Sequence, residues 1–261
     1  MLRLVIRKHS DQKCDCEGLN SMTCRLKILR LQGCGLTAET CQYLSQYFFL
    51  IHLLSMNIWP NTLFMFVVFL LSVSRCGITG AGCRYLAKVL CSISQLTDGW
   101  MGVGEWQAVE LIDLDLSMNH IGDKGVKEIS PGLMNPLSHL KTLNLTYCSL
   151  TDSCCAELAS GLMSKENILS ELDLSHNNLQ DKGVKKLYIG LQSPCSVFLF
   201  LFRLRTCGLT SRSVQFLTSA LKLNPFYLTE LHLVGNRLEN SEIRALAELT
   251  KNHKYALRTI E

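Results

Sequence analysis

The chain has 261 residues, of which 48% are hydrophobic and 18% charged, so it can bury a core and is not a disordered tail. Its net charge of +4 is modest and is not gathered into one basic run, which does not favour a nucleic-acid partner. The first residues, "MLRLVIRKHSDQKC", lack the apolar core of a signal peptide. We therefore expect a cytoplasmic protein whose 13 cysteines are reduced thiols.

Two regions follow one another along the chain. Residues 1–25 show no period and are predicted to form an irregular N-terminal segment, whereas residues 26–261 contain a pattern that recurs seven times, L-x-x-L-x-L-x-x-(N/C)-x-L. The steps between its Asn/Cys positions are 42 and 43 residues at first and then 29 or 30. The Asn/Cys position falls at Cys34, Cys76, Asn119, Cys148, Asn177, Cys207 and Asn236.

Each repeat changes its hydrophobic period half-way. Alternating leucines before the Asn/Cys position predict a short strand, and apolar residues seven, ten and fourteen positions after it predict an amphipathic helix. Threonines stand just ahead of four of these helices, where they can cap the first amides: Thr37, Thr79, Thr151 and Thr210. One such unit cannot bury its apolar face, so the sequence predicts an α/β right-handed solenoid, a horseshoe with parallel strands on the concave face and helices on the convex face. Leu257 and Ile260 predict a further strand in register, and we expect the chain to be part of a longer horseshoe.

Two insertions account for the long steps. The first, near 49–63, lies in a stretch without charged residues from Thr40 to Ser74, but Trp59 and Pro60 with flanking polar residues divide it into pieces too short to span a membrane. We expect apolar material packed on the solenoid edge, or translated noncoding sequence, and no membrane association. The second, residues 92–110, is glycine-rich; its Trp100 and Trp106 either contact a partner or pin the loop to its neighbours.

No catalytic or metal-binding pattern is present in the sequence. Cysteines at the Asn/Cys position, and at the helix position that Val or Ile fills elsewhere, are predicted to be structural. Cys14, Cys16 and Cys24 lack the partnering pair that a zinc site needs. There is no phosphate loop, no nucleophile elbow and no H-E-x-x-H, so we expect no enzyme activity, cofactor or metal.

Acidic residues gather at strand positions that are predicted to face the concavity. Adjacent strands lie about 4.8 Å apart, below the screening length of about 8 Å at physiological salt, so neighbouring carboxylates would repel one another and attract a basic partner. The alternative is that they only keep the face soluble. The candidate partner-binding residues on the strands are Asp113, Asp115, Glu171, Asp173 and Glu230.

The stretches "LRLQGCGLTAETCQYLS" and "LDLSHNNLQDKGVKKL", and the alternation of Asn and Cys from Cys76 onward, resemble leucine-rich repeats of the ribonuclease-inhibitor type. They are most similar to the C-terminal region of NOD-like receptors. The resemblance implies a non-enzymatic interaction module of innate immunity that senses a ligand, or holds the NACHT module of a parent receptor inactive, through its concave face. The NACHT module itself has no counterpart in this sequence.

Two other functions remain open for such repeats. A soluble inhibitor like ribonuclease inhibitor shares the repeat class, although a basic net charge suits a basic nuclease poorly. A GTPase-activating leucine-rich-repeat protein would need an exposed arginine near one end, for which Arg75, Arg203 and Arg205 are candidates.

Overall fold

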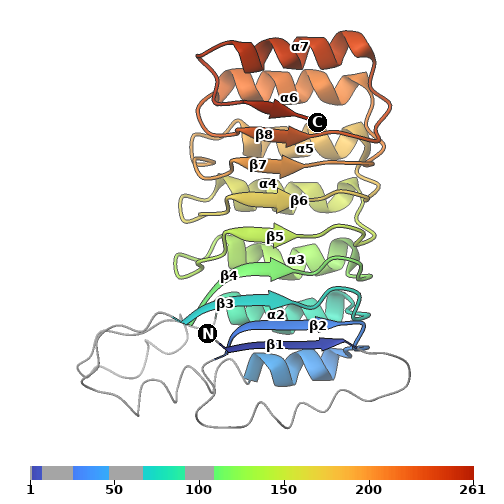
Figure 1. The fold of residues 1–261 in the computed structure, drawn as a ribbon, viewed down its shortest axis with the longest axis vertical. Coiled ribbons are helices and arrows are strands. Elements are labelled where there is room, and N and C mark those ends of the chain that lie inside the picture. The colour runs from blue at the N-terminus through green and yellow to red at the C-terminus, as the bar shows by residue number, and fades with distance from the viewer. Residues whose placement is uncertain (1, 8–25, 47–66, 92–108) are drawn as a thin grey trace, which may run out of the picture.

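A computed structural model describes residues 2–7, 26–46, 67–91 and 109–261. In these ranges the strands form one parallel sheet of nine strands in the order β1 to β9. The strands lie side by side and the helices cover the opposite face of the sheet (Figure 1). The strands are β1 (Leu2–Arg7), β2 (Leu26–Gln32), β3 (Val67–Ser72), β4 (Val109–Asp115), β5 (Thr142–Asn144), β6 (Glu171–Asp173), β7 (Leu201–Arg203), β8 (Glu230–His232) and β9 (Thr259–Ile260). The helical segments are residues 38–46, α2 (Gly80–Cys91), α3 (Gly122–Leu133), the 3-10 turn η2 (Asp152–Cys154), α4 (Cys155–Met163), α5 (Gln180–Leu191), α6 (Ser211–Leu223) and α7 (Asn240–Lys251).

The register of the sheet repeats the register of the sequence. Leu114 of β4 pairs with Leu143 of β5, which pairs with Leu172 of β6, and all three are fully buried. The buried side chains join into one core that runs from Leu29 to Leu257, because each strand and each helix contributes the same apolar positions. The predicted α/β solenoid is confirmed.

Both ends of the sheet carry a strand outside the seven repeats. The strand expected around Leu257 and Ile260 is confirmed as β9, which pairs with β8. At the other end the structure differs from the expected irregular segment, since residues 2–7 form β1 and pair in parallel with β2. The run "LRLVIR" is rich in strand-forming residues and needs only the open edge of β2 to be ordered. The first insertion and most of the second, with Trp100 and Trp106, lie outside the described residues.

The residue at the Asn/Cys position bonds each repeat to the one before it. Asn177 accepts the backbone N–H groups of Cys148 and Leu150 through Oδ1, and its Nδ2 donates to the carbonyl of Leu145. Asn119 and Asn236 make the same bonds one pair of repeats away. In the cysteine repeats the thiol donates to the preceding repeat instead, as Cys148 Sγ does to the Leu116 carbonyl at 3.2 Å. The predicted structural role of these cysteines is confirmed.

A second set of bonds joins the helix starts. Asp181 of α5 accepts the backbone N–H of Thr210 at 2.8 Å and its hydroxyl at 2.5 Å, and Asp123 of α3 accepts the same two groups of Thr151. Thr210 and Thr151 in turn cap their own helical turns, as predicted. Asn repeats thus supply the aspartate, and the cysteine repeats that follow them supply the threonine.

Candidate interaction surface

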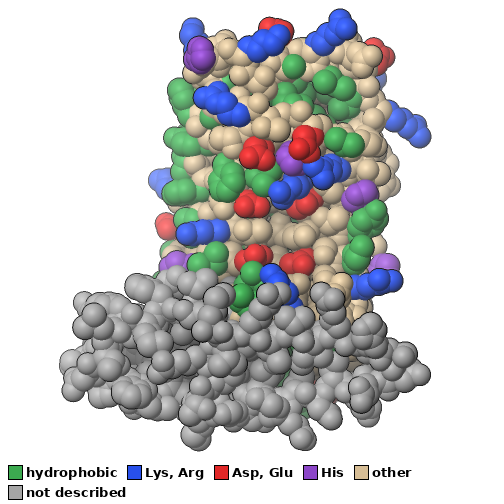
Figure 2. All heavy atoms as spheres, in the orientation of Figure 1, with side chains coloured by type: hydrophobic (Ala, Val, Ile, Leu, Met, Phe, Trp, Pro, Cys, Tyr) green, Lys and Arg blue, Asp and Glu red, His purple; other side chains and the backbone are tan. Residues whose placement is uncertain are grey.

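The outward-facing positions of β4 to β8 form two rows across the sheet. The register places Asp113, Thr142, Glu171, Leu201 and Glu230 in one row. It places Asp115, Asn144, Asp173, Arg203 and His232 in the other. Acidic side chains therefore occur at several levels of this strand face, with basic side chains and a histidine between the upper ones (Figure 2).

The surroundings of Asp113 disfavour its charge. Burial raises its pKa above the usual 3.8, the nearby charges of Asp115 and Glu171 raise it further, and Arg30 partly offsets them. These carboxylates lie on the same strand (Asp115) and two strands away (Glu171), because Thr142 occupies the row position between Asp113 and Glu171. A cation placed beside Asp113 would lower the cost of its charge.

Asp115 and Asp173 have a structural task that their spacing did not reveal. Each accepts the backbone N–H two residues on, from Ser117 at 3.0 Å and from Ser175 at 2.9 Å, and so shapes the turn that follows its strand. Asn144 makes the same bond to the N–H of Thr146. Because an uncharged asparagine makes the same bond, we expect the turn to form without the negative charge of Asp115 and Asp173.

Arginines and a histidine divide the upper part of the face. Arg203 lies 3.6 Å from the Glu171 carboxylate, and the guanidinium of Arg205 is ion-paired with Glu261. Arg205 Nη2 is also 2.8 Å from His232 Nδ1, and the opposite ring nitrogen, Nε2, lies 3.6 Å from the Glu230 carboxylate. The charge of Glu171 is thus partly neutralised by Arg203. The sequence places these residues on the strands or just after them, but it does not show that their side chains meet.

The chain is similar to several known proteins. A family profile described as Leucine Rich repeat matches residues 111–130, 137–159 and 167–187. The chain is 31% identical to pig ribonuclease inhibitor over 94% of its own length and 53% of the relative. It is 32% identical to human NACHT, LRR and PYD domains-containing protein 12 over 94% of its length and 23% of the relative, and 35% identical to human NACHT, LRR and PYD domains-containing protein 5 over 84% and 18%.

The repeats, their stacking and these similarities agree. The chain is a leucine-rich-repeat protein. It spans about half of the ribonuclease inhibitor that it matches and less than a quarter of the NACHT, LRR and PYD proteins. It is a leucine-rich-repeat interaction module related to both groups, as the resemblance of its repeats implies.

Two cysteines at the Asn/Cys position of this leucine-rich-repeat protein are poor nucleophiles. Burial raises the pKa of Cys148 and of Cys207 to about 12, so both are protonated at neutral pH. Among the described residues no three His, Cys, Asp or Glu side chains lie together as metal ligands. Cys14, Cys16 and Cys24 lie outside that part of the chain.

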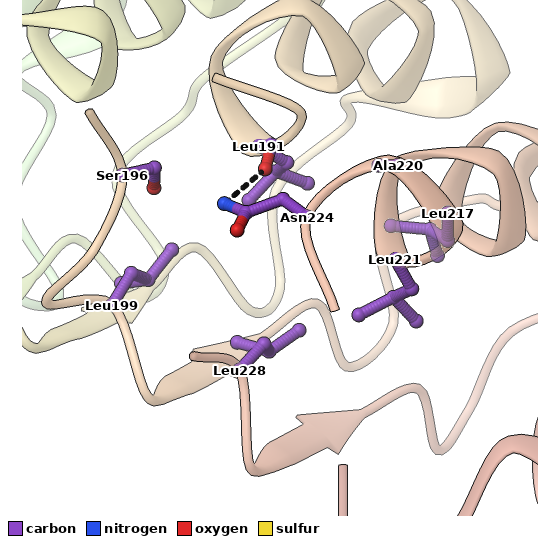
Figure 3. Close-up of a pocket in the computed structure, with 8 residues that line it drawn as sticks. All are labelled: Leu191, Ser196, Leu199, Leu217, Ala220, Leu221, Asn224 and Leu228. Carbon is purple, nitrogen blue, oxygen red and sulfur yellow. Dashed lines mark hydrogen bonds between the residues drawn. The ribbon is translucent and has the colours of Figure 1, made fainter. Parts of the chain in front are cut away.

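A small hollow between the repeats of α5 and α6 is lined mostly by core side chains. It holds about 20 Å³ and is lined by apolar side chains that include Leu199 and Leu217, while Asn224 Nδ2 donates to the Leu191 carbonyl at 3.1 Å (Figure 3). Such a volume admits about one water molecule and no larger ligand.

None of the described helices combines the length and the apolar character needed to cross a membrane.

Proposed function

We propose that this leucine-rich-repeat chain acts as the ligand-sensing or autoinhibitory region of a cytoplasmic NOD-like receptor of innate immunity. Similarity to NACHT, LRR and PYD proteins over 94% of the chain carries the proposal. The partner would be a protein held on the strand face, including the NACHT module of the parent receptor. Trp100 and Trp106 of the second insertion, outside the described residues, are further candidate contacts for this partner.

The acidic residues of the strand face favour a partner with a basic surface. Asp113, Asp115 and Asp173 engage in no salt bridge between described residues, whereas Glu171 and Glu230 face Arg203 and His232. The attraction is therefore strongest over β4 to β6. Charges of this kind mainly raise the association rate and make it depend on salt, because they act before the partners touch.

The decisive experiment compares two possible partners of the chain. The purified chain is tested for binding to the NACHT module of human NACHT, LRR and PYD domains-containing protein 12, and for inhibition of a ribonuclease. Binding without inhibition is the expected result. Inhibition of the nuclease without binding to the NACHT module would instead favour the inhibitor function that pig ribonuclease inhibitor suggests.

The contribution of the acidic residues is tested by removing charge without disturbing the turns. The double variant Asp115→Asn/Asp173→Asn keeps the turn bond that Asn144 already makes, so it should fold normally. Its association with the NACHT module should be several-fold slower at about 50 mM salt, and the difference should shrink at about 150 mM because screening increases. An unchanged association rate at low salt would mean that the charges only keep the face soluble.

The GTPase-activating alternative has weaker support in the structure. Arg203 and Arg205 are engaged in ion pairs on the strand face, and an activating arginine has to reach a bound nucleotide. Arg75 is exposed but stands in the turn after β3. This alternative would be supported only if the chain stimulated a GTPase and the Arg75→Ala variant did not.

A further inference from the structure

The residue just before the Asn/Cys position forms an edge of the solenoid that sequence reasoning missed. In the repeats of β2 and β8 it is glycine, Gly33 and Gly235, with φ of 69° and 78°. In the five repeats between them the same left-handed conformation is held by residues with side chains, which normally avoid it. These residues, here called the turn edge, are Arg75, Met118, Tyr147, His176 and Thr206, with φ between 53° and 58°.

The turn edge borders a hollow of about 710 Å³ that is open to solvent. Arg75, Met118, Tyr147 and His176 all line it, as does His120, and none of its ten lining residues is acidic. Asp123 stands close by, but both its oxygens accept bonds from Thr151. Figure 2 shows the resulting run of histidine, hydrophobic and basic side chains along the right-hand edge of the molecule.

The side chains in this hollow supply two kinds of contact. Tyr147 and His176 stack in parallel with ring centroids 4.1 Å apart, and Tyr147 and Met118 remain about half exposed, so an apolar platform faces solvent. Arg75 at one end offers a guanidinium fork that matches a carboxylate. His120 also lines the hollow; its Nδ1 lies 3.1 Å from Ser149 Oγ and adds a polar group. An adjoining hollow shares His120 and adds Arg84 and Lys124, with Glu128 as its acidic lining residue.

We infer that the turn edge binds an extended acidic peptide segment of a partner protein, with a carboxylate on Arg75 and an aromatic or aliphatic side chain on the Tyr147–His176 stack. Arg75 and His176 belong to repeats three strands apart, which is about 14 Å at the usual strand spacing. An extended chain covers that distance with about four residues. The acidic and the apolar residue of the ligand should therefore lie about four positions apart.

Peptide is favoured over nucleic acid by the kind of charge in the hollow. Nucleic-acid sites gather several Lys and Arg side chains to neutralise phosphates, and this hollow has one arginine among its lining residues. The hollow has no acidic lining residue, unlike the acidic strand face, and it lies at the turns that follow the strands. It can therefore be occupied whether or not the proposed receptor function is correct.

The test uses a short probe of matching chemistry. The peptide Glu-Glu-Ala-Ala-Trp-Gly, labelled with fluorescein at its C-terminus, is titrated with the full chain and followed by anisotropy. It should bind at least about tenfold more tightly than the same peptide with Lys in place of Glu, because a lost charge-assisted bond costs about that factor. Arg75→Glu should weaken binding of the acidic peptide by about tenfold or more.

Two glycine variants separate binding from folding. Tyr147→Gly removes half of the platform but relieves a left-handed backbone, so it should weaken binding while its thermal midpoint stays at or above that of the parent chain. Thr206→Gly makes the same change at the same backbone position outside the hollow and should leave binding unchanged. Equal binding of acidic and basic peptides, equal losses in the two variants, or tighter binding of an oligothymidylate would overturn the inference.

Discussion

At the scale of single residues, Asn177 shows how one side chain ties two repeats together. It is 5% exposed, accepts two backbone N–H groups of the preceding repeat and donates to the carbonyls of Leu145, Leu174 and Ser175. The sequence marked this position because the residue recurs at a fixed step, but the bonds to the preceding repeat are seen only in the structure. The sequence did not indicate that Arg203 meets Glu171, or that Tyr147 and His176 stack, since spacing fixes the strand and not the direction in which a long side chain turns.

Asn177→Ala should therefore be among the most damaging single substitutions in the chain. It leaves buried N–H and carbonyl groups without partners, each of which costs about 1–3 kcal/mol, so we expect a loss of at least about 3 kcal/mol in the free energy of unfolding. Denaturant unfolding followed by circular dichroism measures the loss. The neighbouring Asn178→Ala, an exposed position, should change stability by no more than about 0.5 kcal/mol, and a similar loss in both variants would contradict the prediction.

At the scale of secondary-structure elements, the repeats are joined where their helices begin. Asp181 at the start of α5 holds the N–H and hydroxyl of Thr210, the residue that caps α6, and also accepts from the Ser213 hydroxyl. Partial burial alone would raise the pKa of Asp181, but the bonds from Ser213 and Thr210 outweigh it and lower the pKa below 3.8. A threonine before a helix predicts a helix cap. The bond from that threonine to an aspartate of the previous repeat could be seen only once the repeats are stacked.

Asp181→Asn should lower the free energy of unfolding by about 1 kcal/mol at neutral pH, discounted for solvent exposure. Because the folded pKa is lowered, the wild-type carboxylate stabilises the fold above its ordinary pKa, and this contribution is lost as the pH falls through the folded value. The difference between the two proteins should therefore close in acid. Asp123→Asn, which removes the same bonds to Thr151, serves as the matched variant. A difference that stays constant down to strongly acidic pH would show that the charge is not responsible.

At the scale of the whole molecule, the solenoid was predictable because its evidence is repetition. The leucine positions, the Asn/Cys position and the helix period each occur seven times, so they outweigh any local ambiguity. The interaction surfaces occur once and depend on side-chain geometry. The left-handed backbone at Tyr147 has a sequence signal only in hindsight, in Gly33 and Gly235 at the equivalent positions of two other repeats.

The same architecture predicts that damage spreads only to neighbouring repeats. The contacts of α5 are with α4, η2 and α6, and those of α7 are with α6 and β9, so each repeat is stabilised mainly by those beside it. Leu187 in α5 and Leu246 in α7 are both fully buried, and replacing either by alanine should cost about 2–5 kcal/mol locally.

Hydrogen exchange read by mass spectrometry should therefore distinguish the two substitutions. Leu246→Ala should lower amide protection in α7, β9 and the adjoining ends of α6 and β8, and should leave β4 to β6 as protected as before, because those strands do not contact α7. Leu187→Ala lies mid-way and should lower protection on both of its sides, from α4 to α6. Uniform loss of protection across the sheet in Leu246→Ala would mean that the repeats unfold as one cooperative unit, and would exclude the nearest-neighbour account of their stability.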